Sequence, residues 1–250
     1  MRPSGVFVTG TDTEVGKTVV ASAIAATLAA QGRRVSVFKP VVTGLDDLAG
    51  LEPDHERLRA AARSSQQRWD IAPDRFGPPV SPHLAAAAAG ERIDPYRLLA
   101  AAQRAARAGD VLVAEGVGGL MVPLSGDYLV RDLAADIGMP VVIAARPGLG
   151  TISHALMTVE CARAAGLTVK AVVLTPWPAR PSELERSNRA TIARLGRVEV
   201  ETLPVLALRS IGPQRSLSVE RWVDRHHGVA PIPALEVRET QAPRRAAAAA

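Results

Sequence analysis

The sequence predicts a single α/β domain in which a mostly parallel, doubly wound sheet carries helices on both faces. Short apolar segments alternate with helical segments along the chain, a pattern typical of βαβ units. The apolar segments are hydrophobic at nearly every position, as expected of strands that are covered on both sides. The length of 250 residues suits one such domain, and a hydrophobic content of 47% supplies its core.

Strands and helices are expected in alternation from the start of the chain. The strands are expected at 6–9, 35–38, 111–114, 141–144 and 169–174, with a weaker one at 198–203. The helices are expected at 17–30, 55–62, 96–108, 151–165 and 181–195, and an alanine run at 85–89 predicts part of another. Prolines in the stretch 73–82 predict a loop.

The chain divides into one large domain and a C-terminal part with a weaker pattern. Residues 1–210 are expected to form the domain, and residues 211–240 an extension with room for one helix near 218–225. Residues 241–250 are of low complexity, which predicts a disordered tail.

Composition argues against several classes of partner. The net charge is +5, but arginines are scattered along the helices and aromatic residues make up only 3%, too few for stacking on bases. No nucleic-acid partner is therefore expected. No apolar run approaches the roughly 20 residues that span a bilayer, so no membrane partner is expected either. The single cysteine and the lack of a secretion signal pattern predict a cytoplasmic protein.

The strongest motif is the glycine-rich turn GTDTEVGKT at residues 10–18, between the first strand and the first helix. Backbone N–H groups of such a turn point at one spot, and the helix dipole adds positive charge, which together make a phosphate cradle. Lys17 is expected to reach the β- and γ-phosphates, and the Thr18 hydroxyl to ligate Mg²⁺. Five residues separate Gly10 from Gly16, one more than in the common motif. The turn predicts a P-loop NTPase fold.

The longer loop included, GTDTEVGKT resembles the signature of the dethiobiotin synthetases. Three more segments resemble the same family in the same order: KPVVTG at 39–44, PVSPH at 79–83 and EGVGG at 115–119. The similarity covers about residues 5–206. Four ordered motifs are far more specific than any one of them.

The resemblance implies a ligase of biotin biosynthesis. Its members use CO₂, Mg²⁺ and ATP, or another nucleoside triphosphate, to close a ureido ring on 7,8-diaminononanoate. One amine takes up CO₂ as a carbamate, the carbamate attacks the γ-phosphate to give a mixed anhydride, and the second amine displaces phosphate. The family also implies a homodimer with small-molecule substrates.

Two lysines are the catalytic candidates, Lys17 and Lys39. Lys39 follows the second strand, at the carboxyl edge of the sheet where α/β proteins bind their ligands. An ammonium there would hold the carbamate in line with the γ-phosphate. The resemblance implies further substrate contacts from Thr13 and Thr43, and a binding site for the substrate carboxylate from the neighbouring subunit at a helix start formed by Gly150, Thr151, Ile152 and Ser153.

Hard oxygen ligands are expected around Mg²⁺. Thr18, Asp54 and Glu115 are the candidates, with Glu115 placed just after the strand at 111–114. Asp54 precedes a helical stretch, so an N-cap is the alternative role. Asp46 and Asp47 are competing candidates in the same loop.

The nucleotide-binding candidates come from five segments at the same edge. They are Glu14, Val15, Gly16, Lys17, Thr18, Val19, Asp54, Glu115, Gly116, Val117, Gly118, Thr175, Pro176, Pro204, Val205 and Leu206. Thr175 and Pro176 stand where the family often has an asparagine that contacts adenine. A base preference other than adenine therefore stays open.

Two rival functions share this fold class. A ParA/MinD-like regulatory ATPase would carry an extra lysine beside the first glycine of the loop, where this chain has Thr11. A corrinoid-type amide ligase would carry a second domain with a nucleophilic cysteine, for which the chain is too short.

Overall fold

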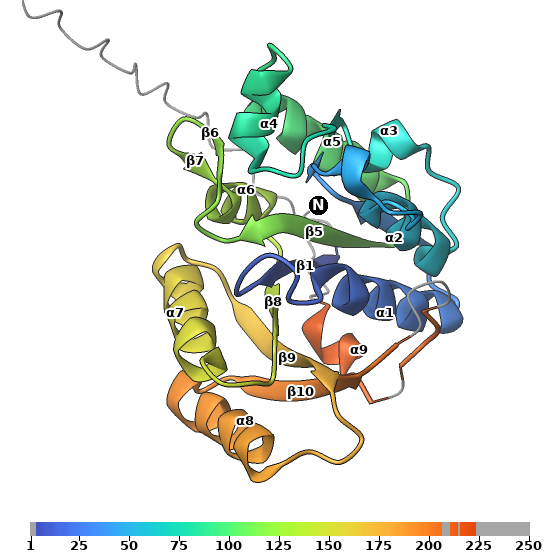
Figure 1. Cartoon of the computed structure of the whole chain (residues 1–250). Coiled ribbons are helices and arrows are strands. Elements are labelled where there is room, and N and C mark those ends of the chain that lie inside the picture. Colours follow the sequence, from blue (N-terminus) through green and yellow to red (C-terminus); the bar gives the residue numbers. More distant parts are fainter. Residues whose placement is uncertain (1–3, 207–210, 215, 224–250) are drawn as a thin grey trace, which may run out of the picture.

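A computed structural model describes residues 4–206, 211–214 and 216–223. Within these residues the main sheet has six strands in the order β10-β9-β8-β1-β5-β2, and all neighbouring strands are parallel (Figure 1). The expected tail at 241–250 and most of the expected extension lie outside the described residues. The strands are β1 (Gly5–Gly10), β2 (Val35–Phe38), β5 (Val111–Gly119), β8 (Val141–Ala145), β9 (Val169–Trp177) and β10 (Glu199–Pro204).

Helices cover both faces of this sheet. Four short strands form two small ribbons outside it: β3 (Val41–Val42) with β4 (Asp74–Arg75), and β6 (Pro123–Ser125) with β7 (Tyr128–Leu129). The helices are α1 (Lys17–Ala30), α2 (Asp54–Ala62), α3 (Arg68–Ile71), α4 (Pro82–Ala88), α5 (Pro95–Arg107), α6 (Val130–Ile137), α7 (Thr151–Ala164), α8 (Glu183–Gly196) and α9 (Val219–Trp222), with a 3₁₀ turn, η1 (Leu45–Asp47).

Two hydrophobic cores lie on opposite faces of the sheet. In β1, Val6 and Val8 point into the core beneath α1, α2, α3 and α9, whereas Phe7 points into the core beneath α4 to α8. Successive side chains of a strand point to opposite faces, so a strand buried on both sides is apolar throughout. The structure confirms the doubly wound α/β architecture expected from this pattern.

Several boundaries differ from the expected ones. The strand expected at 111–114 continues to Gly119, where it pairs with Gly10, and the strand expected at 169–174 continues to Trp177. Both extensions contain residues of low strand propensity, and pairing with a neighbouring strand overrides that propensity. Helix α6 was not expected, although its buried residues, including Val130, Leu133 and Ile137, have helical spacing.

The segment after β10 packs back onto the domain. Trp222 of α9 is fully buried in the core beneath α1, together with Leu217 and Val219. Backbone N–H groups of Gln214 and Ser218 donate to Thr27 Oγ1 at 2.9 Å and to the Glu201 carboxylate at 3.0 Å. No helix in the described residues is both long enough and apolar enough to cross a membrane.

The edge strand β2 pairs on one side with β5 and on the other with a side chain. The Val37 N–H donates to Gln66 Oε1 at 2.8 Å, and Gln66 Nε2 donates to the Val37 carbonyl at 3.2 Å. Ser64 Oγ donates to the same Gln66 oxygen at 2.9 Å. The amide thus replaces a neighbouring strand two residues before Lys39, and it fixes the strand from which Lys39 extends.

Replacing Gln66 by methionine should destabilise the protein. The substitution keeps the side-chain length but leaves the buried Val37 N–H and carbonyl without partners, which costs about 1–3 kcal/mol. We expect the free energy of unfolding, measured in urea, to fall by that amount. Gln103→Met, on the half-buried side of α5, is the matched control. Equal losses in the two variants would contradict the role of Gln66.

Candidate active site

The P-loop joins β1 to α1 at the carboxyl edge of the sheet. Gly16, the N-cap of α1, has a φ of 89°, and no side chain caps the helix. A β-carbon on Gly10 would lie 2.6 Å from Val15 Cγ2 and 2.9 Å from Lys17 Cγ, so the loop folds tightly over a residue that has to be glycine. The uncapped N–H groups of the first turn suit an anion.

Lys17 lies inside this loop. Its Nζ donates to the Asp12 carbonyl at 2.7 Å, which holds the ammonium within the cradle. Burial and, second to it, the nearby charge of Lys39 lower the pKa of Lys17 to about 8, against the opposing effect of the surrounding carboxylates. A bound anion would favour the charged form of this side chain.

Lys39, Glu115, Thr18 and Asp54 form a contact cluster beside the P-loop. Lys39 Nζ donates to Glu115 Oε1 at 2.5 Å and to Asp54 Oδ2 at 2.9 Å, and Thr18 Oγ1 donates to the same Glu115 oxygen at 2.7 Å. Glu115 is fully buried and Lys39 is 3% exposed. Residues far apart in the sequence therefore meet at one point, as the sequence predicted for the carboxyl edge of the sheet.

The charges in this cluster are strongly coupled. Burial alone would lower the pKa of Lys39, but the two carboxylates outweigh it and raise the pKa above its usual value. Burial would raise the pKa of Asp54, and the Lys39 ammonium reverses this and lowers it. Burial raises the pKa of Glu115 by more than Lys39 lowers it. The raised pKa of Lys39 favours its charged ammonium form.

The oxygen atoms of the cluster suit a hard divalent cation. The Thr18 hydroxyl donates its one hydrogen bond to Glu115, so the lone pairs of its oxygen stay available to a metal. Glu115 Oε2 is buried with no hydrogen-bond partner among the described residues. The set consists of two carboxylates, Asp54 and Glu115, and one hydroxyl, Thr18. It therefore differs from a cluster of three His, Cys, Asp or Glu side chains suited to a metal, of which the described part of the chain has none. The donors are those that Mg²⁺ prefers.

The three candidate aspartates lie in different places. Asp54 is the first residue of α2 and contacts Lys39, while Pro53 occupies the N-cap position. Asp46 lies against the loop after β4, since a β-carbon on Gly77 would be 2.2 Å from Asp46 Oδ2. Asp47 is exposed in η1. Of the three, Asp54 is the one in the cluster.

The glycine-rich run lies within β5, which places Glu115 inside the strand rather than after its end. Gly116 is buried, and a β-carbon on it would lie 3.1 Å from Val130 Cγ1 and 3.2 Å from Phe7. Gly118 has a φ of 60°, which favours glycine, and Val117 is half-buried beside it. Beyond Glu115 the run continues along the P-loop, where Gly119 pairs with Gly10.

The candidates for base contact lie at the ends of β9 and β10. Thr175 is 2% exposed, and a β-carbon on Gly16 would lie 2.6 Å from its methyl carbon Cγ2. Thr175 therefore packs against the P-loop, whereas Pro176 is exposed. Pro204 pairs with Trp177, and it leads to the exposed Val205 and the half-buried Leu206.

The substrate candidates occupy three segments of the same edge. Thr13 is exposed in the P-loop, and Thr43 is half-buried directly after β3. β3 pairs with β4, and the Gly44 N–H donates to the Pro78 carbonyl at 3.0 Å. The segments 39–44 and 79–83, distant in sequence, are therefore tied together.

The third segment is the start of α7. Gly150, its N-cap, has a φ of 90° and no side chain caps the helix. Thr151 is 6% exposed, and its hydroxyl has no hydrogen-bond partner among the residues described. Ile152 is half-buried and Ser153 is exposed. None of these residues contacts the Lys39 cluster through a recorded hydrogen bond.

Two residues that sequence reasoning missed hold the loops in place. Asn188, buried in α8, donates from Nδ2 to the carbonyls of Pro147 at 2.9 Å and Gly148 at 3.1 Å, which shapes the approach to α7. Nothing in the helical pattern of α8 marks it. Arg146, directly after β8, donates to the Glu14 carbonyl at 3.2 Å. Arg146 could have been singled out from the sequence because it directly follows an expected strand.

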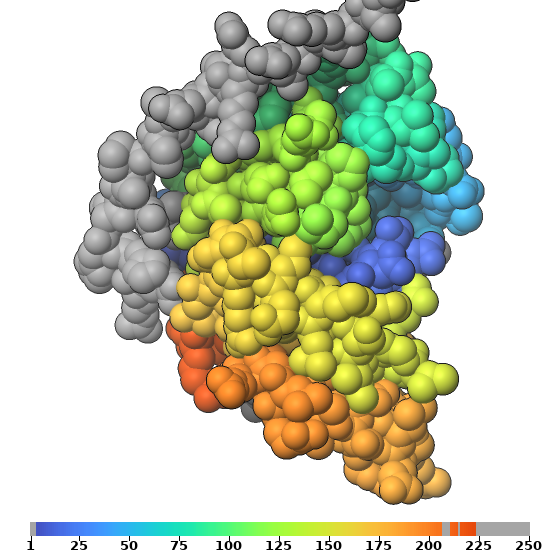
Figure 2. Space-filling view, turned by 90° about the vertical axis from the view of Figure 1, so that its left-hand side faces the viewer, coloured from blue at the N-terminus to red at the C-terminus, as the bar shows by residue number. Residues whose placement is uncertain are grey.

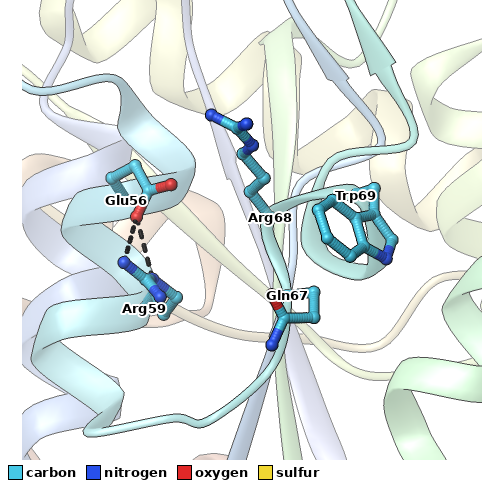
Figure 3. A pocket seen from close by; sticks show the side chains of 5 residues that line it. All are labelled: Glu56, Arg59, Gln67, Arg68 and Trp69. Atoms are coloured by element: carbon cyan, nitrogen blue, oxygen red, sulfur yellow. Dashed lines mark hydrogen bonds and ion pairs between the residues drawn. The ribbon is translucent and has the colours of Figure 1, made fainter.

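A separate depression of about 260 Å³ lies between α2 and α3 (Figure 3). Glu56, Arg59, Gln67, Arg68 and Trp69 line it, and Arg59 turns toward Glu56, with which it forms an ion pair at 2.8 Å. None of the predicted site residues lines this depression.

Comparisons with known proteins show the family of the chain. The family model described as an AAA domain matches residues 4–208. The ATP-dependent dethiobiotin synthetase BioD of Bacillus subtilis (strain 168) is 37% identical over 193 residues, which cover 76% of this chain and 82% of that protein. The protein of the same name from Aromatoleum aromaticum is 44% identical over 175 residues, which cover 67% of this chain and 76% of that protein.

Among solved structures, the MinC:MinD cell division protein complex of Aquifex aeolicus matches with a TM-score of 0.51 and 13% identity, over 80% of this chain and 81% of that one. Similarity at this level shows the fold alone, and the fold is the expected one. The sequence identities to the synthetases extend over most of both chains, and the protein therefore belongs to the ATP-dependent dethiobiotin synthetase family, whose members are ligases.

Proposed function

We propose that this protein closes the ureido ring of dethiobiotin from 7,8-diaminononanoate, CO₂ and ATP, as a step of biotin biosynthesis. The observation that carries the proposal is the buried Lys39 ammonium, held by Glu115 and Asp54 beside a P-loop. The reaction is inferred from family membership, and the charged groups beside the P-loop are suited to carry it out.

The reaction asks for three bond-forming steps. An amine of the substrate adds to CO₂ and loses a proton, which gives an anionic carbamate. A carbamate oxygen attacks the γ-phosphorus of ATP, which releases ADP and leaves a carbamic-phosphoric anhydride. The second amine then attacks the carbonyl carbon, so that the ring closes and inorganic phosphate leaves. Both the carbamate and the phosphoryl group carry negative charge that the protein has to position and neutralise.

Lys39 is suited to bind the carbamate. Its raised pKa keeps the ammonium charged, and its buried position excludes the water that would weaken an ion pair. The backbone N–H of Lys39 donates to the Ile71 carbonyl at 2.8 Å, which fixes the start of the side chain. Thr43, four residues along, is proposed to hydrogen-bond the carbamate, and Thr13 to contact the substrate from the P-loop.

Lys17 and the P-loop are suited to hold the triphosphate. In this role the Lys17 ammonium exchanges the Asp12 carbonyl for the phosphate oxygens, aided by the N–H groups of residues 14–19. We propose that Gly116, Val117 and Gly118 line the nucleotide, and that Thr175, Pro176, Pro204, Val205 and Leu206 contact the base.

Thr18, Asp54 and Glu115 are the residues that would hold Mg²⁺. A bound Mg²⁺ would neutralise phosphate charge and orient the γ-phosphate. The unpartnered Glu115 Oε2 and the free lone pairs of Thr18 support this assignment. Asp54 and Glu115 would also keep Lys39 charged and in position.

A homodimer would complete the substrate site. Large apolar side chains are exposed before, on and beside α7: Leu149 at 92%, Met157 at 58% and Met121 at 56%. Cys161 Sγ lies 3.3 Å from Met121 Sδ, so α7 and the residues after β5 share one face, which Figure 2 shows in yellow and lime green. We propose that a second copy covers this face. The partner's α7 would then bind the substrate carboxylate with the uncapped N–H groups of its first turn.

A MinD-like switch is the competing function. In that class, nucleotide hydrolysis would respond to DNA or lipid vesicles rather than to small molecules. No observation on the described residues favours it, and Thr11 stands where that class carries a lysine. A cytoplasmic location stays a prediction.

Product formation tests the proposal, and two lysine variants separate its parts. The purified protein, given 7,8-diaminononanoate, bicarbonate, Mg²⁺ and ATP, should form dethiobiotin detectable by mass spectrometry.

Lys39→Met should lower turnover by about a thousandfold while ATP affinity stays within a few-fold of the parent. Lys17→Met should instead weaken ATP binding itself, measured by calorimetry.

Stability needs a separate check, because Lys39→Met leaves two carboxylates without their cation. Lys39→Arg keeps the charge and should recover stability without recovering the rate, since a guanidinium differs from an ammonium in shape. Turnover of Lys39→Met within tenfold of the parent would remove Lys39 from the mechanism.

The aspartates allow a matched test of the Mg²⁺ site. Asp54→Asn should raise the Mg²⁺ concentration for half-maximal ring closure by at least about tenfold, because it weakens one hard ligand. Asp46→Asn and Asp47→Asn remove the same charge from the neighbouring loop and should leave that concentration unchanged. An equal shift in all three variants would point to general charge instead of a ligand.

Shared sites can be tested with mixed dimers. Gly150→Val should inactivate the protein, because valine is strained at a φ of 90° and would reshape the start of α7. If that helix serves the partner's site, dimers of one Lys39→Met subunit and one Gly150→Val subunit contain one intact site. We expect the mixed dimers to form dethiobiotin, and we expect none from dimers that contain only the Lys39→Met subunit or only the Gly150→Val subunit. Inactive mixed dimers, or a monomer by light scattering, would refute the shared site.

A further inference from the structure

The lengthened P-loop contains a strained residue. Glu14 is not glycine, yet its φ is 55°, a left-handed conformation that side chains disfavour because of the β-carbon. It lies among the five residues between Gly10 and Gly16, where the loop is one residue longer than the common motif. Such a conformation persists when surrounding contacts hold it.

The contact that holds it comes from the neighbouring strand. Arg146 directly follows β8, and its Nη2 donates to the Glu14 carbonyl at 3.2 Å. β8 is paired with β1, and the Thr11 N–H donates to the Ala144 carbonyl at 3.0 Å. The end of β8 therefore contacts the P-loop at two points, near its start at Thr11 and farther along at Glu14.

The two contacts on the loop differ in what happens to them when a nucleotide binds. Lys17 reaches the Asp12 carbonyl from inside the cradle, where phosphate oxygens would compete for the same ammonium. Arg146 extends from another strand to the tip of the loop, and its contact does not depend on Lys17. The Arg146 contact therefore need not break if Lys17 turns to the phosphates.

We propose that Arg146 is a positioning residue that holds Glu14 in its left-handed conformation and thereby preforms the cradle for the triphosphate. The inference rests on the proposed function in one respect, that the P-loop takes a nucleoside triphosphate. Arg146 acts through the loop backbone rather than on the reacting atoms. Its loss therefore lowers nucleotide affinity and leaves the KM for the diamine unchanged.

Calorimetry with ATP and Mg²⁺, without diamine, measures this effect. Arg146→Met keeps most of the side-chain length and removes the donor, and we expect the Kd for ATP to rise about fivefold. Arg146→Lys keeps a donor and a charge and should recover most of the affinity. Arg104→Met, at an exposed position of α5, is the control for loss of one positive charge and should bind as the parent does. An unchanged Kd for Arg146→Met overturns the proposal.

A double-mutant cycle with Glu14→Gly separates anchoring from direct attraction to phosphate. Glycine adopts the left-handed conformation without strain, so Arg146→Met should cost less affinity in the Glu14→Gly background than in the parent. Additive effects would mean that Arg146 acts by its charge alone, and they would overturn the proposal. The measurement needs no turnover, so a parent protein that binds ATP but forms no dethiobiotin would refute the proposed function while leaving this inference open to test.

Discussion

A lysine ammonium held between a buried carboxylate, Glu115, and a partly exposed one, Asp54, is the interaction on which the site depends. Lys39 reaches Glu115 at 2.5 Å and Asp54 at 2.9 Å, in surroundings that leave Glu115 fully buried. The Glu115 carboxylate would not be tolerated there alone, because an isolated charge is expensive to bury. The ion pairs therefore hold one cation and two hard oxygen ligands beside the P-loop in the protein without substrate.

Sheet topology explains how these groups come together. β1 and β2 lie on either side of β5, so the P-loop, Lys39 and Glu115 come from three adjacent parallel strands. The carboxyl ends of parallel strands meet at one edge, and α/β proteins bind their ligands there. Asp54 joins from the start of α2, whose Leu58 packs into the core shared with α1. The Gln66 amide fixes the free edge of β2, so that the strand carrying Lys39 is held on both sides.

Sequence reasoning reached the parts of this site that local patterns encode. The bounds of α1 and β2 could be predicted because a Gly-Lys-Thr turn and an apolar run mark them, and Lys39 followed from its place directly after β2. Glu115 was singled out because it follows an apolar run, although it lies inside β5 rather than after it. The length of β5 could not, because its last residue, Gly119, pairs with the distant Gly10, which no local pattern shows. Contacts such as Asn188 with Pro147, or Arg146 with Glu14, join residues 41 and 132 positions apart. No local pattern in one sequence encodes which helix side chain meets which distant carbonyl.

The two oxygens of Glu115 show how the cluster can serve an ammonium and a metal ion together. Oε1 accepts from both Lys39 and Thr18, while Oε2 has no partner in the described chain. If one oxygen had to serve both cations, binding a metal would displace Lys39 and remove the group proposed for the carbamate. Because the two oxygens of Glu115 have different partners, Lys39 can stay hydrogen-bonded to Oε1 while Oε2 is open to a hard cation. The raised pKa of Glu115 agrees with this division, because a buried oxygen without a partner disfavours the charged form until a cation approaches it.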